Sequence, residues 1–303
     1  MIIWLRRHLL RCHYVIILLI IYVLGVGSNT KTKYRIINDF LRIKFMKNDQ
    51  LSHEEMFDFL EAKHELYNRP GFIEDDPISI PHNFSGKEDI EISGFLTATI
   101  AWGNRKMILR NANRLMQMMD NAPYDFILNF TESDLKPFDS FVHRTFNGTD
   151  CKYFLKAMKF IYTQKGGLEV LFAGDARDDM KELISRFRSL FFEPEHPART
   201  EKHVANPVKG SSAKRINMFL RWMVRDDGRG VDFGIWNSLE PSQLYCPLDV
   251  HSGNIARRLG LLTRKQNDWK AVSELTESLR IFDKNDPVKY DFSLFGLGVN
   301  EKF

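Results

Sequence analysis

Two segments of the chain hold residues whose types and spacing suit anion binding and charge-dependent chemistry. Gly210-Ser-Ser-Ala-Lys214 places small residues directly before an amphipathic helix. Backbone N–H groups there can approach a phosphate, and a helix N-terminus favours an anion, which would lie close to Lys214. Downstream, Asp249 stands between apolar neighbours, ahead of a second helix. Each residue also has a simpler structural interpretation, Lys214 as an exposed lysine and Asp249 as the N-cap of a helix over residues 250–259 that Gly260 ends.

Two longer stretches of the chain are unusually basic. Residues 101–119 contain four basic residues and no acid, and residues 198–225 contain seven basic residues against Glu201 alone. The basic residues are Arg105, Lys106, Arg110 and Arg114 in the first stretch and Arg199, Lys202, Lys209, Lys214, Arg215, Arg221 and Arg225 in the second. Such stretches are typical of a protein that binds a polyanion. The alternative is a solvated helix face whose partners lie elsewhere in the fold.

The elements that must position these residues are helices. From Glu54 onward, apolar residues recur at helical spacing and almost nowhere at the alternating spacing of strands. One helix is expected over residues 54–67, opened by a capping box of Ser52 and Glu55. The pattern predicts an all-α protein of one or two closely packed helical lobes, in which the longest loop is 193–210.

Composition narrows the class of protein further. A chain of 303 residues with 44% hydrophobic residues can form a large core, which excludes disorder, collagen and coiled coil for the whole. Cys12, Cys151 and Cys246 lie far apart, so neither a disulfide framework nor a cysteine-built metal site is expected, and a reducing compartment is the simpler assumption. The formal net charge of +4 comes from the basic residues of 1–45, and the remainder is acidic on balance. Nucleic-acid binding would therefore depend on local patches.

Residues 1–45 form a basic and apolar leader that holds no residues suited to chemistry. Within it, 14–27 is an uncharged apolar run, shorter than the roughly 20 residues that cross a bilayer and within the length of a signal-peptide core. Met46 begins a stretch typical of a protein start. Three interpretations stay open: upstream sequence read from a misplaced start codon, with a cytoplasmic protein at 46–303; a membrane anchor through residues 14–27; and a cleaved signal.

The order of these motifs resembles the helix-hairpin-helix DNA glycosylase superfamily, which includes endonuclease III and 8-oxoguanine DNA glycosylase. Gly210-Ser-Ser-Ala-Lys214, with Asn217 three residues later, is similar to the hairpin that starts a helix in that family. Pro247-Leu-Asp249-Val-His251 is similar to the stretch that carries the family's aspartate. Residues 90–106 look like its early helix beside the DNA, and residues 146–152 resemble the turn before a long helix. The resemblance implies a two-lobed helical fold of the glycosylase type.

The same resemblance implies an enzyme that flips a damaged or mispaired nucleotide out of duplex DNA into a pocket between two lobes. Lys214 would be the nucleophile at the sugar C1′ that forms a Schiff base, and Asp249 would stabilise the positive charge that develops on the sugar. The implied DNA-contacting residues are Asn104, Arg105, Lys106, Gly210, Ser211, Ser212, Arg215, Asn217 and His251. No metal or other cofactor is implied, because the chain has no terminal cysteine cluster for an iron–sulfur centre.

Several other residues are candidates for the wall of the pocket between the two lobes. Candidates for stacking on a flipped base, each equally suited to a core, are Trp102, Trp222, Phe233 and Trp236. Asp286 is expected to cap the last helix, and Lys289 and Asp291 are candidates for the cleft wall. Residues 226–245 separate Lys214 from Asp249 and carry acids that would repel a phosphate unless they turn away, namely Asp226, Asp227, Asp232 and Glu240.

The leading interpretation is therefore a monomeric DNA N-glycosylase or abasic-site lyase whose partner is duplex DNA. A second interpretation is a non-catalytic nucleic-acid-binding protein on the same scaffold. A third is an all-α protein unrelated to DNA, in which both basic stretches pair internally with acids. Over 46–303 the chain also resembles a family of bacterial conserved hypothetical proteins, through segments at 218–225, 230–234 and 286–292, and this resemblance implies no activity.

Overall fold

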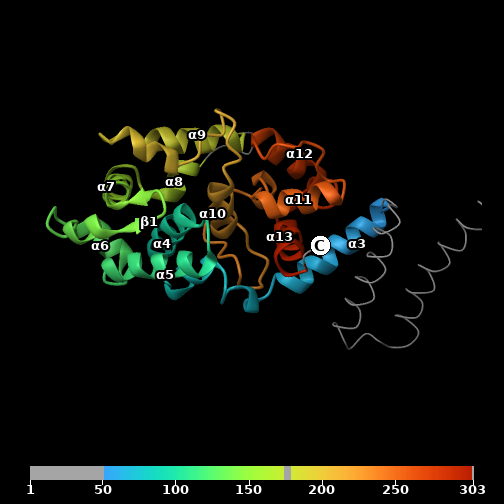
Figure 1. Ribbon diagram of the computed structural model, residues 1–303, viewed down its shortest axis with the longest axis horizontal. Coiled ribbons are helices and arrows are strands. Elements are labelled where there is room, and N and C mark those ends of the chain that lie inside the picture. The colour runs from blue at the N-terminus through green and yellow to red at the C-terminus, as the bar shows by residue number, and fades with distance from the viewer. Residues whose placement is uncertain (1–50, 174–178, 302–303) are drawn as a thin grey trace, which may run out of the picture. The chain divides into compact units, whose positions relative to one another are not determined.

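The computed structural model describes residues 51–173 and 179–301, and this part of the chain is mostly helical (Figure 1). The α-helices are α3 (His53–Tyr67), α4 (Lys87–Ile100), α5 (Arg105–Met118), α6 (Pro123–Asn129), α7 (Gly148–Gln164), α8 (Leu168–Phe172), α9 (Met180–Phe191), α10 (Lys214–Val224), α11 (Val250–Arg258), α12 (Trp269–Arg280) and α13 (Asp291–Asn300). Short 3₁₀ turns are η2 (Pro70–Phe72), η3 (Pro77–Ser79), η4 (Pro81–Asn83), η5 (Lys136–Ser140), η6 (Ala198–His203), η7 (Pro241–Gln243) and η8 (Pro287–Tyr290).

The strand content of the described residues is one small antiparallel pair. Strand β1 (Val142–His143) pairs with β2 (Phe146–Asn147), with Val142 opposite Asn147. The prediction of an all-α protein is confirmed at this level. The leader at 1–45 and the proposed start at Met46 lie outside the described residues.

The chain divides into two compact units, Met1–Ala62 and Lys63–Phe303, and the boundary falls within α3. In the first unit, the described residues form the start of this helix. Ser52 N–H donates to Glu55 Oε2 at 2.8 Å, and Glu55 N–H donates to Ser52 Oγ at 3.2 Å. The predicted capping box is confirmed, and the helix that it opens begins at His53.

Helix α4 is buried on all sides in the second unit. Residues 90–100 are all buried, which accounts for an apolar sequence without a polar face. Gly94 allows α10 to approach closely, because a Cβ at this position would lie 3.2 Å from Met223 Cε and 3.5 Å from Phe219 Cε2. Next to it, Phe95 contacts the rings of Phe154, Phe187, Phe191 and Phe219. The contact between α4 and α10 is therefore the centre of a core rich in phenylalanine.

Helix α10 lies between two groups of helices in the view of Figure 1, with α5 to α9 on one side and α11 to α13 on the other. In the second group, α11 and α13 pack closely, and a Cβ on Gly298 would lie 3.2 Å from His251 Cβ. Lys214 is the first residue of α10, and Asp249 directly precedes α11. The packing of the second group on α10 therefore decides whether these two residues meet.

Two expectations about helix ends are wrong. Residues 90–106 do not form one helix, because α4 ends at Ile100, Gly103 adopts a φ of +102°, and Asn104 caps a new helix, α5. The side chain of Asp286 caps no helix: the 3₁₀ turn η8 follows it, and α13 begins only at Asp291. In both places the sequence has a pattern typical of a helix end, but the structure has that end at a different residue.

We expect Gly94→Leu to reduce the free energy of unfolding by about 1–3 kcal/mol, because the larger side chain overpacks the contact between α4 and α10. The matched variant Gly94→Ala should change the same quantity by less than about 1 kcal/mol. Its single methyl group needs only a small shift of the flexible Met223 side chain. Urea unfolding followed by far-UV circular dichroism measures both, and equal effects of the two variants would contradict this account of the packing.

Candidate functional site

A cavity of 910 Å³ lies at the N-terminal end of α10. Its wall comes from segments that are distant in sequence: Lys214 from α10, Trp102 from the loop before α5, and Asp249 from the loop before α11. Helix α13 contributes Asp291 at its start and Phe295 one turn later. The cavity therefore combines charged groups of both signs with aromatic surface.

Lys214 and Asp249 lie together in this cavity. Lys214 Nζ is 3.8 Å from Asp249 Oδ2, and the two side chains are 25% and 27% exposed. The turn before α10 sets the direction of the lysine, because Gly210 and Ala213 both adopt left-handed backbone conformations, with φ of +92° and +48°. The structure thus brings an amine and a carboxylate to one accessible place, as the two sequence motifs suggested.

Asp249 is at the same time the N-cap of α11. Its Oδ1 accepts the backbone N–H of His251 at 2.8 Å and that of Ser252 at 3.0 Å, and the Ser252 hydroxyl donates to the same oxygen at 3.2 Å. The cap fixes the carboxylate through Oδ1 and leaves Oδ2 as the oxygen nearest Lys214. The structural interpretation of Asp249 is correct, and it is compatible with a place in the cavity.

Two other carboxylates of the cavity wall are buried. Burial raises the pKa of Asp291 to about 6, and the charges of Arg221 and Lys214 oppose this rise. Burial likewise raises the pKa of Asp76, whose Oδ1 accepts a backbone N–H of η3 at 3.1 Å. Arg221 Nη1 donates to Asp291 Oδ2, and Arg221 Nε donates to Asp232 Oδ1 at 3.2 Å. Arg221 therefore joins the cavity wall to a carboxylate behind it.

Arg215 supports the aromatic side of the cavity. Its guanidinium lies over the ring of Trp102, 4.8 Å from the ring centroid, and donates to the carbonyl oxygens of Thr99 and His203, the latter at 3.2 Å. Burial lowers the pKa of Arg215 to about 10. The sequence suggested that Arg215 contacts DNA, and the structure shows its donors directed to two backbone carbonyls inside the fold.

The other sequence-predicted contact residues are divided between the cavity and its surroundings. Arg105, Ser212 and His251 line the cavity. Asn104 is exposed and accepts the Met107 backbone N–H at 3.2 Å, and Lys106 beside it is exposed. The remaining three, Gly210, Ser211 and Asn217, belong to the turn before α10 or support it: Ser211 forms an isolated antiparallel bridge with Asp268, and the buried Asn217 donates to the Ser212 carbonyl at 3.2 Å.

Two of the four aromatic candidates lie in the cavity wall, and the other two lie elsewhere. Trp102 and Trp222 line the cavity. Trp236 is buried elsewhere, where its Nε1 donates to Glu91 Oε1 at 2.7 Å, and the Phe233 ring lies tilted against that of His82, with ring centroids 4.3 Å apart. Trp222 is fully buried, so among these four, within the described residues, the partly exposed Trp102 is the ring that a ligand of this cavity can reach.

The basic stretch at 198–225 is largely paired inside the protein, which corrects the expectation of an open cationic face along all of it. Arg199 Nη1 is 2.7 Å from Asp150 Oδ2, and Arg221 and Arg225 are buried among carboxylates. Lys202 and Lys209 remain exposed. The net charge of a stretch therefore overstates what it offers to a polyanion, because three of its arginines already have acidic partners.

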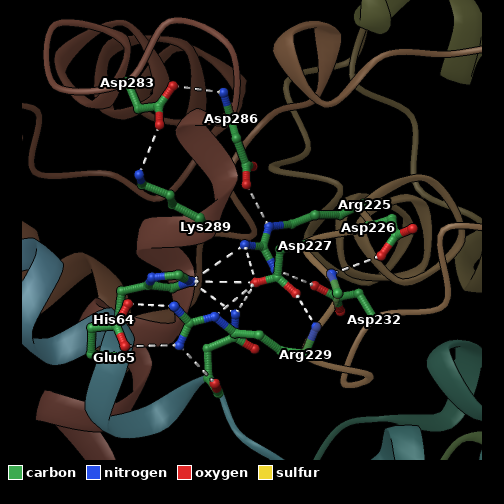
Figure 2. Close-up of polar contacts among 12 residues, drawn as sticks. His64, Glu65, Arg225, Asp226, Asp227, Arg229, Asp232, Asp283, Asp286 and Lys289 are labelled. Carbon is green, nitrogen blue, oxygen red and sulfur yellow. Dashed lines mark hydrogen bonds and ion pairs between the residues drawn. The ribbon is translucent and has the colours of Figure 1, made fainter.

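Figure 2 shows the largest of these clusters, centred on Arg225. Arg225 Nε is 2.7 Å from Asp286 Oδ2, Nη1 is 3.1 Å from Asp232 Oδ2, and Nη2 is 2.8 Å from Asp227 Oδ2. Burial lowers the pKa of Arg225, and the three carboxylates more than reverse this effect. Two acids of the 226–245 segment, Asp227 and Asp232, thus turn inward to an arginine instead of toward the cavity.

Sequence reasoning missed Asp76, which lines the cavity. The dipeptide Asp76-Pro77 is typical of a loop, and the burial of Asp76 depends on packing that no local pattern encodes. Of the two candidates near the last helix, Asp291 lies in the cavity wall, whereas Lys289 pairs with Asp283 at 2.7 Å. The useful signal for Asp291 is an acid placed at the start of a helix that is otherwise apolar.

The described residues contain neither a candidate metal site nor a candidate membrane-spanning helix. Between 51 and 173 and between 179 and 301, no group of three or more His, Cys, Asp and Glu side chains is arranged to hold a metal ion. Over the same residues, no helix combines the length and apolar character that crossing a membrane requires. The apolar run at 14–27 lies outside the described residues.

Comparison with known protein families assigns the chain to one of them. The model of a family described as "protein of unknown function (DUF2400)" matches residues 76–300. No curated protein and no solved structure matches the chain. The matched range contains Asp76, Lys214, Asp249 and Asp291, and therefore every carboxylate of the cavity described above.

We expect Arg225→Met to lower the free energy of unfolding by about 3–5 kcal/mol, because it leaves buried carboxylates without their cation. Arg264→Met is the matched control, since Arg264 forms an ion pair near the surface with Asp268, four residues on in the loop before α12. That control should cost about 1 kcal/mol or less. Urea unfolding measures both values, and a similar small loss for the two variants would show that the Arg225 cluster is not a structural requirement.

Proposed function

The chain belongs to the DUF2400 family, and we propose that it is a DNA glycosylase or abasic-site lyase of the helix-hairpin-helix type. In this proposal Lys214 is the Schiff-base nucleophile and Asp249 is the carboxylate that stabilises charge on the sugar. The observation that carries the proposal is the meeting of Lys214 Nζ and Asp249 Oδ2 at 3.8 Å in a cavity of 910 Å³. Both residues belong to the motifs that resemble this superfamily.

The size and wall of the cavity support a flipped nucleotide as the ligand. Small-molecule sites commonly measure about 300–1,000 Å³, are lined by aromatic surface and hold few polar groups. Trp102, backed by the Arg215 guanidinium, offers a face on which a base can stack, and Trp222 lies in the same wall. An enzyme that acts on a base in duplex DNA must first bring that base into such a pocket.

The charges at Lys214 suit cleavage of an N-glycosidic bond. As the base leaves, positive charge develops on the sugar, and a carboxylate held in place beforehand stabilises it without reorganisation. The cap of α11 holds Asp249 in this way, through two backbone N–H groups and the Ser252 hydroxyl. The neighbouring lysine can then attack C1′ and form a covalent intermediate.

Contacts to the DNA backbone would come from exposed groups near the cavity. Asn104 and Lys106 lie next to cavity residues 101–103 and 105, and Ser212 lies in the turn before α10. In that turn the backbone N–H groups of Gly210 and Ser211 already donate to the carbonyl oxygens of Pro207 and Asn206, at 3.0 and 3.2 Å. Exposed lysines and serine hydroxyls are suitable partners for phosphates. The paired arginines of 198–225 contribute to the scaffold in this account instead of to the DNA interface.

We expect the full chain to form a covalent adduct with a duplex that carries an abasic site when borohydride is present, because borohydride reduces the Schiff base. Lys214→Gln should abolish the adduct, and Asp249→Asn should slow its formation by about 100-fold. Lys289→Gln is the control, since this lysine pairs with Asp283 and lies outside the cavity wall. Gel electrophoresis of labelled DNA gives the rates. Binding of the duplex without any adduct would favour the non-catalytic nucleic-acid-binding protein.

We expect the affinity for duplex DNA to fall as salt rises, because phosphate contacts release counterions. Lys106→Gln should weaken binding and reduce the slope of log Kd against log salt by about 0.9 if this lysine makes one phosphate contact. Lys156→Gln is the matched control, as Lys156 is exposed and forms an ion pair with Glu132. Fluorescence anisotropy measures both. Salt-independent binding, or none, would support a protein unrelated to DNA.

A further inference from the structure

Asp291 occupies an unusual position in the cavity wall. It is 6% exposed, and its Oδ2 accepts a hydrogen bond from Arg221 Nη1. Within the described part of the chain, no hydrogen bond reaches its other oxygen, Oδ1. Nor does an ion pair within 4.0 Å join it to Lys214, whose carboxylate partner is Asp249. The carboxyl group is therefore held through one oxygen, while the other remains available.

The charged groups around Asp291 come from several segments. Helix α10 supplies Arg221 and Lys214, the cap of α11 supplies Asp249, and the loop after α10 supplies Asp232. The thiol of Cys246, before α11, and the carboxyl of Asp76, at η3, belong to the same surroundings through their interactions with Asp291 and with Arg221. Burial outweighs these charges and raises the pKa of Asp291 to about 6. Near neutral pH such a group can both accept and donate a proton.

We propose that Asp291 is the proton relay of this site, taking protons from the Lys214 ammonium group and delivering them to the departing base and to the sugar ring oxygen. This inference rests on the proposed function, because it assigns a proton path to the same reaction. It names a residue outside the two motifs that carry the resemblance to the glycosylases. Asp291 shares the cavity wall with Lys214, and Arg221 of α10 holds it there.

Asp291 takes one proton from the ammonium, the free amine of Lys214 attacks C1′, and the C1′–N bond breaks with its electron pair passing to the base. Asp291 gives its proton to the base, takes a second proton from the substituted amine, and gives that proton to O4′ as the sugar ring opens. Of three ammonium protons, one remains on the iminium, one is on the base and one is on O4′. The total charge is unchanged, and Asp291 ends as it began.

Asp249 is less suited to this relay. Its Oδ1 already accepts three donors from residues 251 and 252, and its Oδ2 faces the lysine directly. These contacts hold Asp249 in one orientation, from which it stabilises positive charge on the sugar. The two carboxylates therefore have different tasks: Asp249 stabilises charge from a fixed position, and Asp291 transfers protons.

Arg221 keeps Asp291 in the geometry that the relay requires. Burial lowers the pKa of Arg221, and Asp232 and Asp291 together more than reverse this, so the guanidinium stays charged. Its second ion pair, to Asp232, holds it in place whether Asp291 is charged or neutral. Protonation of Asp291 at Oδ1 leaves the hydrogen bond to Oδ2 intact. The carboxyl group can therefore change its charge without losing its position.

The test measures the rate at which the full chain forms a covalent adduct with an abasic-site duplex. Cyanoborohydride traps the adduct under single-turnover conditions, and the pH is varied from about 5 to about 8. The wild-type rate should rise through about pH 6, where Asp291 loses its proton. Asp291→Asn should be about 100-fold slower at neutral pH, should lose that rise, and should bind the duplex with an unchanged Kd. Asp291→Glu, which keeps a titratable carboxyl group, should restore part of the rate and a rise with pH.

Asp286→Asn is the control for the loss of a buried carboxylate that pairs with an arginine, since Asp286 contacts Arg225 outside the cavity wall. It should keep the wild-type rate and pH profile. A wild-type adduct with the same rate and profile in Asp291→Asn would overturn the relay and leave the lysine chemistry standing. No wild-type adduct would overturn the proposed function and the relay with it. If Asp291→Asn does not fold, a wild-type rate without any rise between about pH 5 and about pH 7 still overturns the relay.

Discussion

Two buried arginines at the C-terminal end of α10, Arg221 within the helix and Arg225 at its C-cap, determine which other segments can surround that helix. Arg221 and Arg225 are fully enclosed, and an enclosed guanidinium without a partner carries a penalty of several kcal/mol. Their carboxylates come from two separate places, the loop after α10 and the region where the last helix begins: Asp227 and Asp232 from the first, Asp286 and Asp291 from the second. The helix can be buried only if both segments fold against it.

This requirement connects the core to the cavity. Arg225 and its three carboxylates, drawn in Figure 2, do not line the cavity, whereas Arg221 shares Asp232 with Arg225 and also reaches Asp291 in the cavity wall. The ion pair that neutralises Arg221 therefore also holds Asp291 in the cavity wall that contains Lys214. Asp249 likewise belongs both to the fold and to the cavity, because it caps α11 and its Oδ2 lies 3.8 Å from Lys214 Nζ.

The sequence predicts the parts of this molecule that depend on neighbours along the chain. Helical spacing of apolar residues, the Ser52 box and the Asp249 cap are local, and the structure has all of them. The meeting of Lys214 with Asp249 was expected from the resemblance of two motifs. Charge partners are not local: Arg199 pairs with Asp150, and the side chain of Glu91, inside the apolar helix α4, accepts hydrogen bonds from Trp236 and Tyr162. Counting charges along a stretch cannot detect such pairs, because the partners are set by tertiary packing.

The left-handed alanine at position 213 has a consequence for the stiffness of the turn before α10. An alanine with a φ of +48° costs about 1–2 kcal/mol relative to the right-handed region, a penalty that glycine would avoid. Glycine, however, would enlarge the set of conformations open to the backbone directly before Lys214. Alanine at position 213 therefore lowers the stability of the fold but restricts the directions in which α10 can start. A strained neighbour therefore fixes the backbone from which the Lys214 side chain leaves, and the entropy of ordering that backbone is lost during folding.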